Sequence, residues 1–142
     1  MSKIRLLLLL AFAFVGPRAA MAADPGLTGA WYGADAQQID GTRASWFGKF
    51  GSDGRYVMEY HWYRGCDLMR RATHEGRWSL KDGVFSTDAD YVDGRFGGPS
   101  ARYTMLSLTA ETMNYKSLRT GNSFDAKRVA GDFKFPNCTP SS

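Results

Sequence analysis

Proline, cysteine and histidine are scarce in this sequence, and each scarcity argues against a class of structure or chemistry. The 142 residues include five Pro, two Cys and two His, against sixteen Gly. Two His without a spare Cys argue against a zinc site, and no C-x-x-C spacing indicates a redox pair. No nucleophile elbow, phosphate-binding loop or paired-carboxylate motif is present. We therefore predict no metal, no cofactor and no enzymatic activity, with an isomerase or hydrolase that uses an internal cavity as the remaining enzymatic hypothesis.

The first 22 residues have the layout of a secretory signal peptide. A short positive head precedes an apolar run over residues 6–15, and small residues follow at 19–23. This order, which ends in an A-x-A-like site, is typical of export signals. The apolar run is too short for the ~20 residues that a membrane-spanning helix needs. We predict cleavage after Ala22, a periplasmic or secreted mature chain of residues 23–142, and no transmembrane segment after cleavage.

The positive charge of the full chain belongs mostly to that N-terminal segment. Three of the 18 basic residues and none of the 14 acidic residues leave with it, so the formal net charge falls from +4 to about +1. A charge this small does not indicate a nucleic-acid-binding surface. We therefore predict no nucleic-acid partner.

The two cysteines suit a single disulfide in one domain. A mature chain of about 120 residues has the size of one domain, and an exported protein meets an oxidising compartment. We predict that Cys66 pairs with Cys138. The bridge would close a loop of roughly 70 residues and contribute about 4 kcal/mol in the chain-entropy model. It would also attach the irregular tail, residues 130–142, to the body of the domain.

Short alternating runs between glycine-containing turns indicate an all-β chain. The clearest run covers residues 55–64, where alternate residues from Tyr56 to Trp62 fall on one face. Dipeptides such as Asp82-Gly83 supply the tight turns. A meander of these strands is expected to close into an antiparallel up-and-down barrel, because closure removes exposed edges. Eight strands are predicted, over residues 28–33, 45–50, 55–64, 70–80, 84–91, 102–109, 113–118 and 123–129.

Two separated motifs resemble the lipocalins and their calycin relatives. Gly29-Ala30-Trp31 forms a G-x-W motif in the first expected strand, and Arg128 lies in the last. The order of hairpins between them is similar to small bacterial lipocalin-like proteins, over roughly residues 27 to 138. The resemblance implies a lipocalin-like barrel in which Arg128 stacks over Trp31 at one end. A disulfide from mid-barrel to the C-terminal tail, as Cys66–Cys138 would be, is also common in that group.

Two groups of polar residues were weighed as functional sites. Glu59, His61 and His74, with Asp67, could form a metal site, but partly exposed strand residues explain the two histidines better. The pattern D-x-D-x-x-D-G over residues 88–94 departs from the calcium-loop spacing and lacks the closing Glu. We interpret it as an acidic turn.

Aromatic residues are the strongest feature, with four Trp, seven Tyr and nine Phe in the full chain. They either fill a small barrel or line an apolar cup within it, because an eight-stranded barrel is just wide enough for both. The leading hypothesis is non-catalytic binding of a small apolar or amphiphilic molecule in the barrel. The alternative is an envelope factor, such as an inhibitor, immunity or attachment protein, that binds protein through Asp93–Ser100 or Arg64–Arg71. The expected lining of the ligand cavity is Trp46, Met58, Tyr60, Trp62, Trp78 and Met105.

Overall fold

The computed structural model describes residues 26–34 and 40–138, and within these ranges the chain forms strands and turns without a helix. The strands are β1 (Gly29–Ala34), β2 (Thr42–Phe50), β3 (Arg55–Arg64), β4 (Asp67–Lys81), β5 (Val84–Val92), β6 (Arg95–Phe96), β7 (Ser100–Leu108), β8 (Thr112–Ser117) and β9 (Ser123–Val129). The expected all-β class is confirmed. The signal peptide expected over residues 1–22 lies outside the described residues. In the described part of the chain, no helix reaches the length and apolarity needed to span a membrane.

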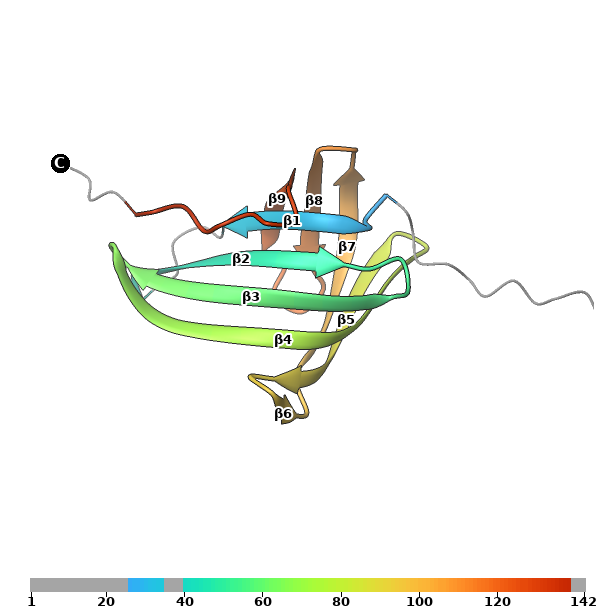
Figure 1. Cartoon of the computed structure of the whole chain (residues 1–142). Helices are drawn as coiled ribbons and strands as arrows, with labels where there is room; N and C mark the ends of the chain where they lie inside the picture. Colours follow the sequence, from blue (N-terminus) through green and yellow to red (C-terminus); the bar gives the residue numbers. More distant parts are fainter. Residues whose placement is uncertain (1–25, 35–39, 139–142) are drawn as a thin grey trace, which may run out of the picture.

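Eight strands close into an antiparallel barrel (Figure 1). β1 to β5 pair in sequence order, β5 pairs with β7, and β7, β8 and β9 follow. β9 then returns to pair with β1, which closes the ring. β6 adds a two-residue strand to the end of β5, outside the ring. The expected up-and-down barrel is therefore confirmed, and its closure leaves no edge strand in the ring.

Several strands extend further than their sequence pattern indicated. β2 begins at Thr42 and β4 at Asp67, so that β3 and β4 form a long hairpin around the turn at Gly65 and Cys66. β4 pairs with β5 only from His74 onward, and the hairpin projects beyond β5 on the left of Figure 1. The added residues, Thr42-Arg43-Ala44 and Asp67-Leu68-Met69, lack a clear alternation of apolar and polar side chains. Pairing with a neighbouring strand, which is a tertiary effect, recruits them into the sheet.

The interior of the barrel follows the period-two alternation of the strands. On β3, Tyr56 and Met58 are buried inside, whereas Val57 between them is 46% exposed on the outside. The buried interior residues gather toward the end of the barrel where the β2–β3, β4–β5 and β7–β8 turns lie. They are Leu27, Trp31, Trp46, Phe50, Tyr56, Met58, Trp78, Phe85, Met113, Tyr115 and Ala126.

This end of the barrel is closed by Trp31 and Arg128. Trp31 is fully buried, and its Nε1 donates a hydrogen bond to the Leu27 carbonyl at 2.9 Å. The Arg128 guanidinium lies over the Trp31 ring and donates to the carbonyls of Gly26 and Thr28, both at 2.7 Å. The arrangement is the one that the resemblance to lipocalins implied. Access to the interior along the barrel axis is therefore blocked at this end by Trp31 and Arg128.

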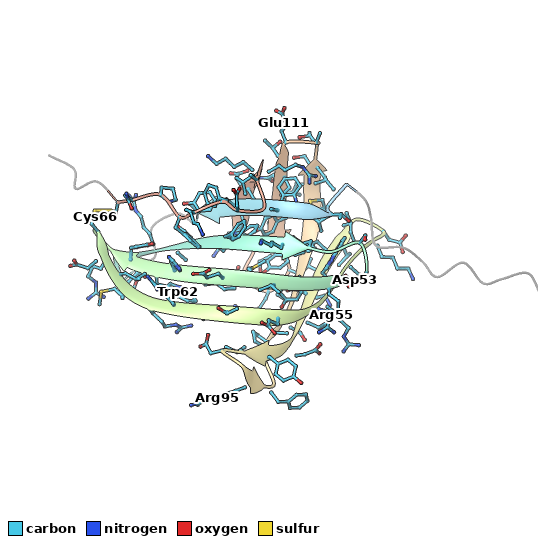
Figure 2. The ribbon with its side chains drawn as sticks, in the orientation of Figure 1. Asp53, Arg55, Trp62, Cys66, Arg95 and Glu111 are labelled. Atoms are coloured by element: carbon cyan, nitrogen blue, oxygen red, sulfur yellow. A yellow bond between two sulfur atoms is a disulfide. The ribbon has the colours of Figure 1, made fainter. Side chains whose placement is uncertain are left out.

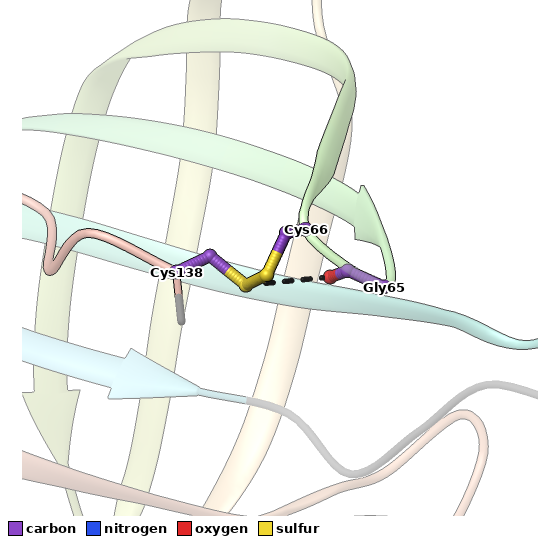
Figure 3. The surroundings of a disulfide bond; sticks show 3 residues. All are labelled: Gly65, Cys66 and Cys138. Carbon is purple, nitrogen blue, oxygen red and sulfur yellow. Dashed lines mark hydrogen bonds between the residues drawn. A yellow bond between two sulfur atoms is a disulfide. The ribbon is translucent and has the colours of Figure 1, made fainter. Parts of the chain in front are cut away.

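A disulfide holds the C-terminal tail against the outside of the barrel. Cys66 and Cys138 are bonded, with their Cα atoms 5.3 Å apart, as predicted (Figure 3). The Cys138 Sγ also lies 3.6 Å from the Gly65 carbonyl oxygen, a contact and no true hydrogen bond because a disulfide sulfur carries no hydrogen. Upstream in the tail, Phe133 packs on Tyr32, with ring centroids 4.8 Å apart.

The tail buries His61, which we expected to be partly exposed. That expectation is wrong, since His61 is 6% exposed. The Phe135 ring stacks on the imidazole with the ring centroids 3.7 Å apart, and the two imidazole nitrogens hydrogen-bond Glu59 and Tyr63. The outer face of a strand is normally open to solvent, so burial here required a tail segment that is distant in the sequence.

Candidate ligand site at the open end of the barrel

A cavity of about 780 Å³ opens at the end opposite the Trp31–Arg128 closure. Its walls come from the ends of β3, β4, β5 and β7 and from the turn between β8 and β9. Figure 2 shows Trp62 on the hairpin strand that forms one wall. The volume falls within the range of small-molecule sites, roughly 300–1,000 Å³. The lining residues are Tyr56, Tyr60, Trp62, Arg70, His74, Thr87, Pro99, Ser100, Ala101, Arg102, Tyr103, Ser117, Leu118 and Arg119.

A smaller pocket of about 120 Å³ lies deeper in the barrel and shares residues with the outer cavity. Tyr60, Thr87 and Tyr103 line both spaces. The remaining wall of the inner pocket is apolar or aromatic and consists of Trp46, Met58, Phe85, Tyr115 and Phe124. Since one water takes about 30 Å³ of liquid volume, the inner pocket has room for a few heavy atoms. The barrel is thus filled at one end and hollow at the other.

Stacked rings form one wall of the outer cavity. Tyr60 and Trp62, two residues apart on β3, are stacked with ring centroids 5.5 Å apart. The His74 ring on β4 lies 4.8 Å from Tyr60. The Arg70 guanidinium is placed over Trp62, 4.1 Å from the ring centre. These contacts hold flat surfaces in fixed orientations, which suits a planar or apolar ligand group.

The charged groups that line the outer cavity are all basic. They are Arg70, Arg102 and Arg119, and no Asp or Glu of the described chain is among the lining residues. Arg102 is already paired, since its Nη2 donates to Asp88 at 3.0 Å. In the described part of the chain, neither Arg70 nor Arg119 forms an ion pair with a carboxylate. The cavity therefore presents two cationic groups without a carboxylate partner.

Burial and the neighbouring charges shift the pKa values of His74 and Tyr56 in the cavity. Burial lowers the pKa of His74, Arg70 lowers it further, and Asp93 opposes both. Burial raises the pKa of Tyr56 to about 12, against a smaller lowering by its hydrogen bond with Thr87. At neutral pH the floor of the cavity is therefore uncharged, and the net charge resides in the arginines.

The structure brings four of the six expected lining residues to these spaces. Trp46, Met58 and Tyr60 line the inner pocket, and Tyr60 and Trp62 line the outer cavity. Trp78 instead packs at the closed end, where its Nε1 donates to the Gly51 carbonyl at 3.0 Å. Met105 lines neither space, and instead packs against the core and borders an open surface hollow near Gly83. That hollow is larger, about 1050 Å³, but its shape is open and it lacks an aromatic wall.

Sequence reasoning missed the basic members of the site. Arg70 begins an expected strand and Arg119 lies between two expected strands, and neither was expected in the cavity lining. In the β3–β4 pairing Arg70 lies opposite Trp62, and the register shifts only beyond this pair, toward the hairpin turn. The available signal was the expected loop around Arg64–Arg71, which we considered as a protein-binding segment.

The structure does not bring together the residues of the metal site that was considered from the sequence. His61 lies on the outer face of β3 under the tail, whereas His74 lines the cavity, so the two cannot share a ligand. Within the described ranges, no three His, Cys, Asp or Glu side chains gather in a metal-binding group. Only Asp93 and Gly94 of the 88–94 segment form the expected turn, because Asp88 and Asp90 lie in strand β5, and each of the three carboxylates has its own partner. Asp88 bonds Ser100 and Arg102, Asp90 pairs with Arg55 and Arg77, and Asp93 accepts from the Thr73 backbone.

Comparison with protein-family models and with curated proteins found no match to this chain.

Proposed function

We propose that this chain is an exported, lipocalin-like binding protein that takes a small amphiphilic molecule into the open end of its barrel. The observation that carries the proposal is the cavity itself. It combines about 780 Å³ of accessible space with a wall of stacked rings, and it continues into an apolar inner pocket. Binding sites for small molecules have this composition, with mostly apolar walls and a few placed polar groups.

The closed end of the barrel supports the comparison with lipocalins. The G-x-W tryptophan lies under an arginine from the last strand, and the disulfide joins the β3–β4 turn to the C-terminal tail. In such a barrel a ligand enters at the end away from that closure. The aromatic cavity lies at that end of this chain.

The cavity chemistry favours binding over catalysis. Among the described lining residues His74 is the one imidazole, and the lining holds no carboxylate that could act as its partner. The cavity's serines, Ser100 and Ser117, are not among the groups that contact His74. A nucleophile–base pair needs its two side chains within hydrogen-bonding reach and a third group that orients the base. We therefore propose that the ligand leaves unchanged.

One observation favours the alternative of a protein-binding envelope factor. Phe96, the last residue of β6, is 87% exposed, and its ring packs edge-on against Tyr91. An exposed aromatic on a projecting hairpin suits a protein interface. The two functions predict different effects of substitution, because Phe96 lies outside the cavity lining.

Two measurements test the proposed function. Native mass spectrometry of the protein purified from its host is expected to show a bound small molecule that dissociates on unfolding. The uncharged probe N-phenyl-1-naphthylamine is expected to fluoresce when added to the ligand-free protein. Trp62→Ala should weaken probe binding by about ten-fold, a loss of about 1.4 kcal/mol. Phe96→Ala, the matched control, should leave it unchanged. Absence of both ligand and probe binding would reject the proposal in favour of the protein-binding alternative.

A further inference from the structure

We propose that the ligand carries an anionic group, a carboxylate or a phosphate, that binds between Arg70 and Arg119 while its apolar part lies against Tyr60 and Trp62. This inference rests on the proposed function and names the chemical class of its ligand. It is drawn from the distribution of charge in the cavity, and the headgroup and the apolar part are argued separately below.

The cavity charge selects against cationic ligands. Arg70 and Arg119 come from opposite walls, Arg70 from β4 and Arg119 from the β8–β9 turn. Asp88, a carboxylate close to the rim, already accepts bonds from Ser100 at 2.6 Å and from Arg102 at 3.0 Å. These bonds lower the pKa of Asp88, that from Ser100 first. Its charge is therefore compensated locally, and the two other arginines remain for a ligand.

Arg70 is held in an orientation suited to this role. Its guanidinium lies over the Trp62 ring, with the guanidinium carbon 4.1 Å from the ring centre, and in the described part of the chain it forms no ion pair with a carboxylate. Stacking reduces the side-chain entropy that binding would otherwise cost. A guanidinium edge offers paired donors that match the two oxygens of a carboxylate or phosphate. The Trp62 ring would then contact both the Arg70 guanidinium and the apolar part of the ligand.

The sizes of the two spaces constrain the apolar part. The inner pocket of about 120 Å³ admits a few heavy atoms, and most of a ligand must stay in the outer cavity of about 780 Å³. In that outer cavity the stacked rings of Tyr60 and Trp62 provide a flat aromatic wall. A planar ring or a short chain fits this arrangement better than a long acyl chain that would have to enter the filled core.

Displacement of the bound fluorescent probe tests the inference. The competitors are 2-naphthoate, 2-naphthyl phosphate and the uncharged 2-naphthamide, which share one ring system. Both anions are expected to displace the probe at concentrations about ten-fold lower than the amide. The ratio between the two anions identifies the preferred headgroup. Displacement by the amide at the same concentration as both anions would overturn the inference and leave the proposed function standing. Failure of the probe itself to bind would instead reject the proposed function.

Matched variants assign the effect to the named residues. Arg70→Gln and Arg119→Gln should each weaken the better anion by about five-fold or more and leave the amide unchanged. Arg71→Gln is the control. It removes the same charge from the residue next to Arg70, and Arg71 does not line the cavity. Equal losses in Arg71→Gln and Arg70→Gln would show that net charge alone is responsible, and this would overturn the assignment. Thermal unfolding of each variant checks that it folds.

A second readout reports the position of the anion. His61 and His74 are the only histidines of the chain, so their ring protons give two resonances that can be followed against pH. His74 faces Tyr60 on β3, Arg70 on β4 and Asp93 in the β5–β6 turn. A bound anion should raise the pKa of His74, and the amide should not. An unchanged His74 pKa with saturating 2-naphthoate would place the anion elsewhere and overturn the inference.

Discussion

The Arg128 guanidinium lies over the Trp31 ring, with the guanidinium carbon 4.3 Å from the ring centre. The contact joins the last strand of the barrel to the first, since Trp31 is opposite Arg128 in the β1–β9 pairing. Arg128 also donates hydrogen bonds to the carbonyls of Gly26 and Thr28, and its Nε donates to Ala110. One side chain therefore ties three segments together at the closed end.

Replacement of Arg128 should destabilise the protein far more than loss of a surface charge. Arg128→Ala should lower the free energy of unfolding by about 1–3 kcal/mol, because it removes the stacked plane and leaves carbonyls without their donors. Arg128→Lys should recover little, since an ammonium lacks the planar fork. Urea denaturation of a double-mutant cycle with Trp31→Phe measures the coupling. Additivity within about 0.3 kcal/mol would mean that the contact contributes nothing.

Gly29 of the G-x-W motif should be irreplaceable for two physical reasons. Its φ is +124°, a conformation that L side chains rarely adopt, and an added Cβ would lie 2.5 Å from Arg128 Nη1. Gly29→Ala should therefore cost about 1–3 kcal/mol for the backbone, plus displacement of the guanidinium. Gly83→Ala is the control, because its φ is +74° and no atom lies within 4 Å of the added Cβ. Chemical denaturation that shows equal losses in both variants would contradict the clash with Arg128.

Removal of the disulfide should release the tail and expose His61. The bridge spans 72 residues, and its loss through the double replacement Cys66→Ser and Cys138→Ser should lower the free energy of unfolding by about 2–5 kcal/mol. Phe135→Ala should loosen the tail over His61 while the bridge remains. Urea denaturation measures the first effect, and reaction of His61 with diethyl pyrocarbonate measures the exposure. Alkylation of both cysteines in the native oxidised protein would contradict the bridge.

Stability should depend on pH through His74. Its pKa is lowered from 6.5 in the folded protein, first by burial and then by Arg70. The unfolded chain therefore takes up a proton first as the pH falls. The stability that neutral His74 contributes is present above about pH 6.5 and is lost as the pH falls through the folded pKa. The unfolding free energy of the parent protein, relative to His74→Gln, should decrease between about pH 7.5 and 5. A constant difference in urea denaturation would contradict this.

Export can be tested directly on protein recovered from its host. The pattern of the first 22 residues predicts that N-terminal sequencing of the mature protein begins at Ala23, or within a residue or two. Mature material that still begins at Met1 would contradict the expected compartment. It would also remove the argument that an oxidising compartment favours the disulfide, although the structure pairs Cys66 with Cys138 independently of that argument.

The sequence by itself determined the strands, their turns and the closed barrel. The alternation along residues 55–64 and dipeptides such as Asp82-Gly83 are local signals, because the strand period and the turn conformation depend on neighbours in the chain. The pairing of Trp31 with Arg128 was also accessible, through the resemblance of the G-x-W motif. The aromatic wall followed from the same alternation, since Tyr60 and Trp62 share a face of β3.

Only the tertiary structure decided which residues complete the site. Arg70 faces the cavity because β4 extends beyond its pairing with β5 and places Arg70 opposite Trp62, and Arg119 reaches it because closure brings the β8–β9 turn opposite β4. The sequence pattern predicts that Trp78, like Trp62, lines the ligand cavity. In the structure Trp78 instead packs at the closed end. Three features depend on residues that are far apart in the chain. They are the filling of one end of the barrel by side chains, the burial of His61 under Phe135, and the two arginines of the cavity. Alternation assigns a side chain to the interior of a barrel, but depth along the axis depends on register and closure, which local sequence does not encode.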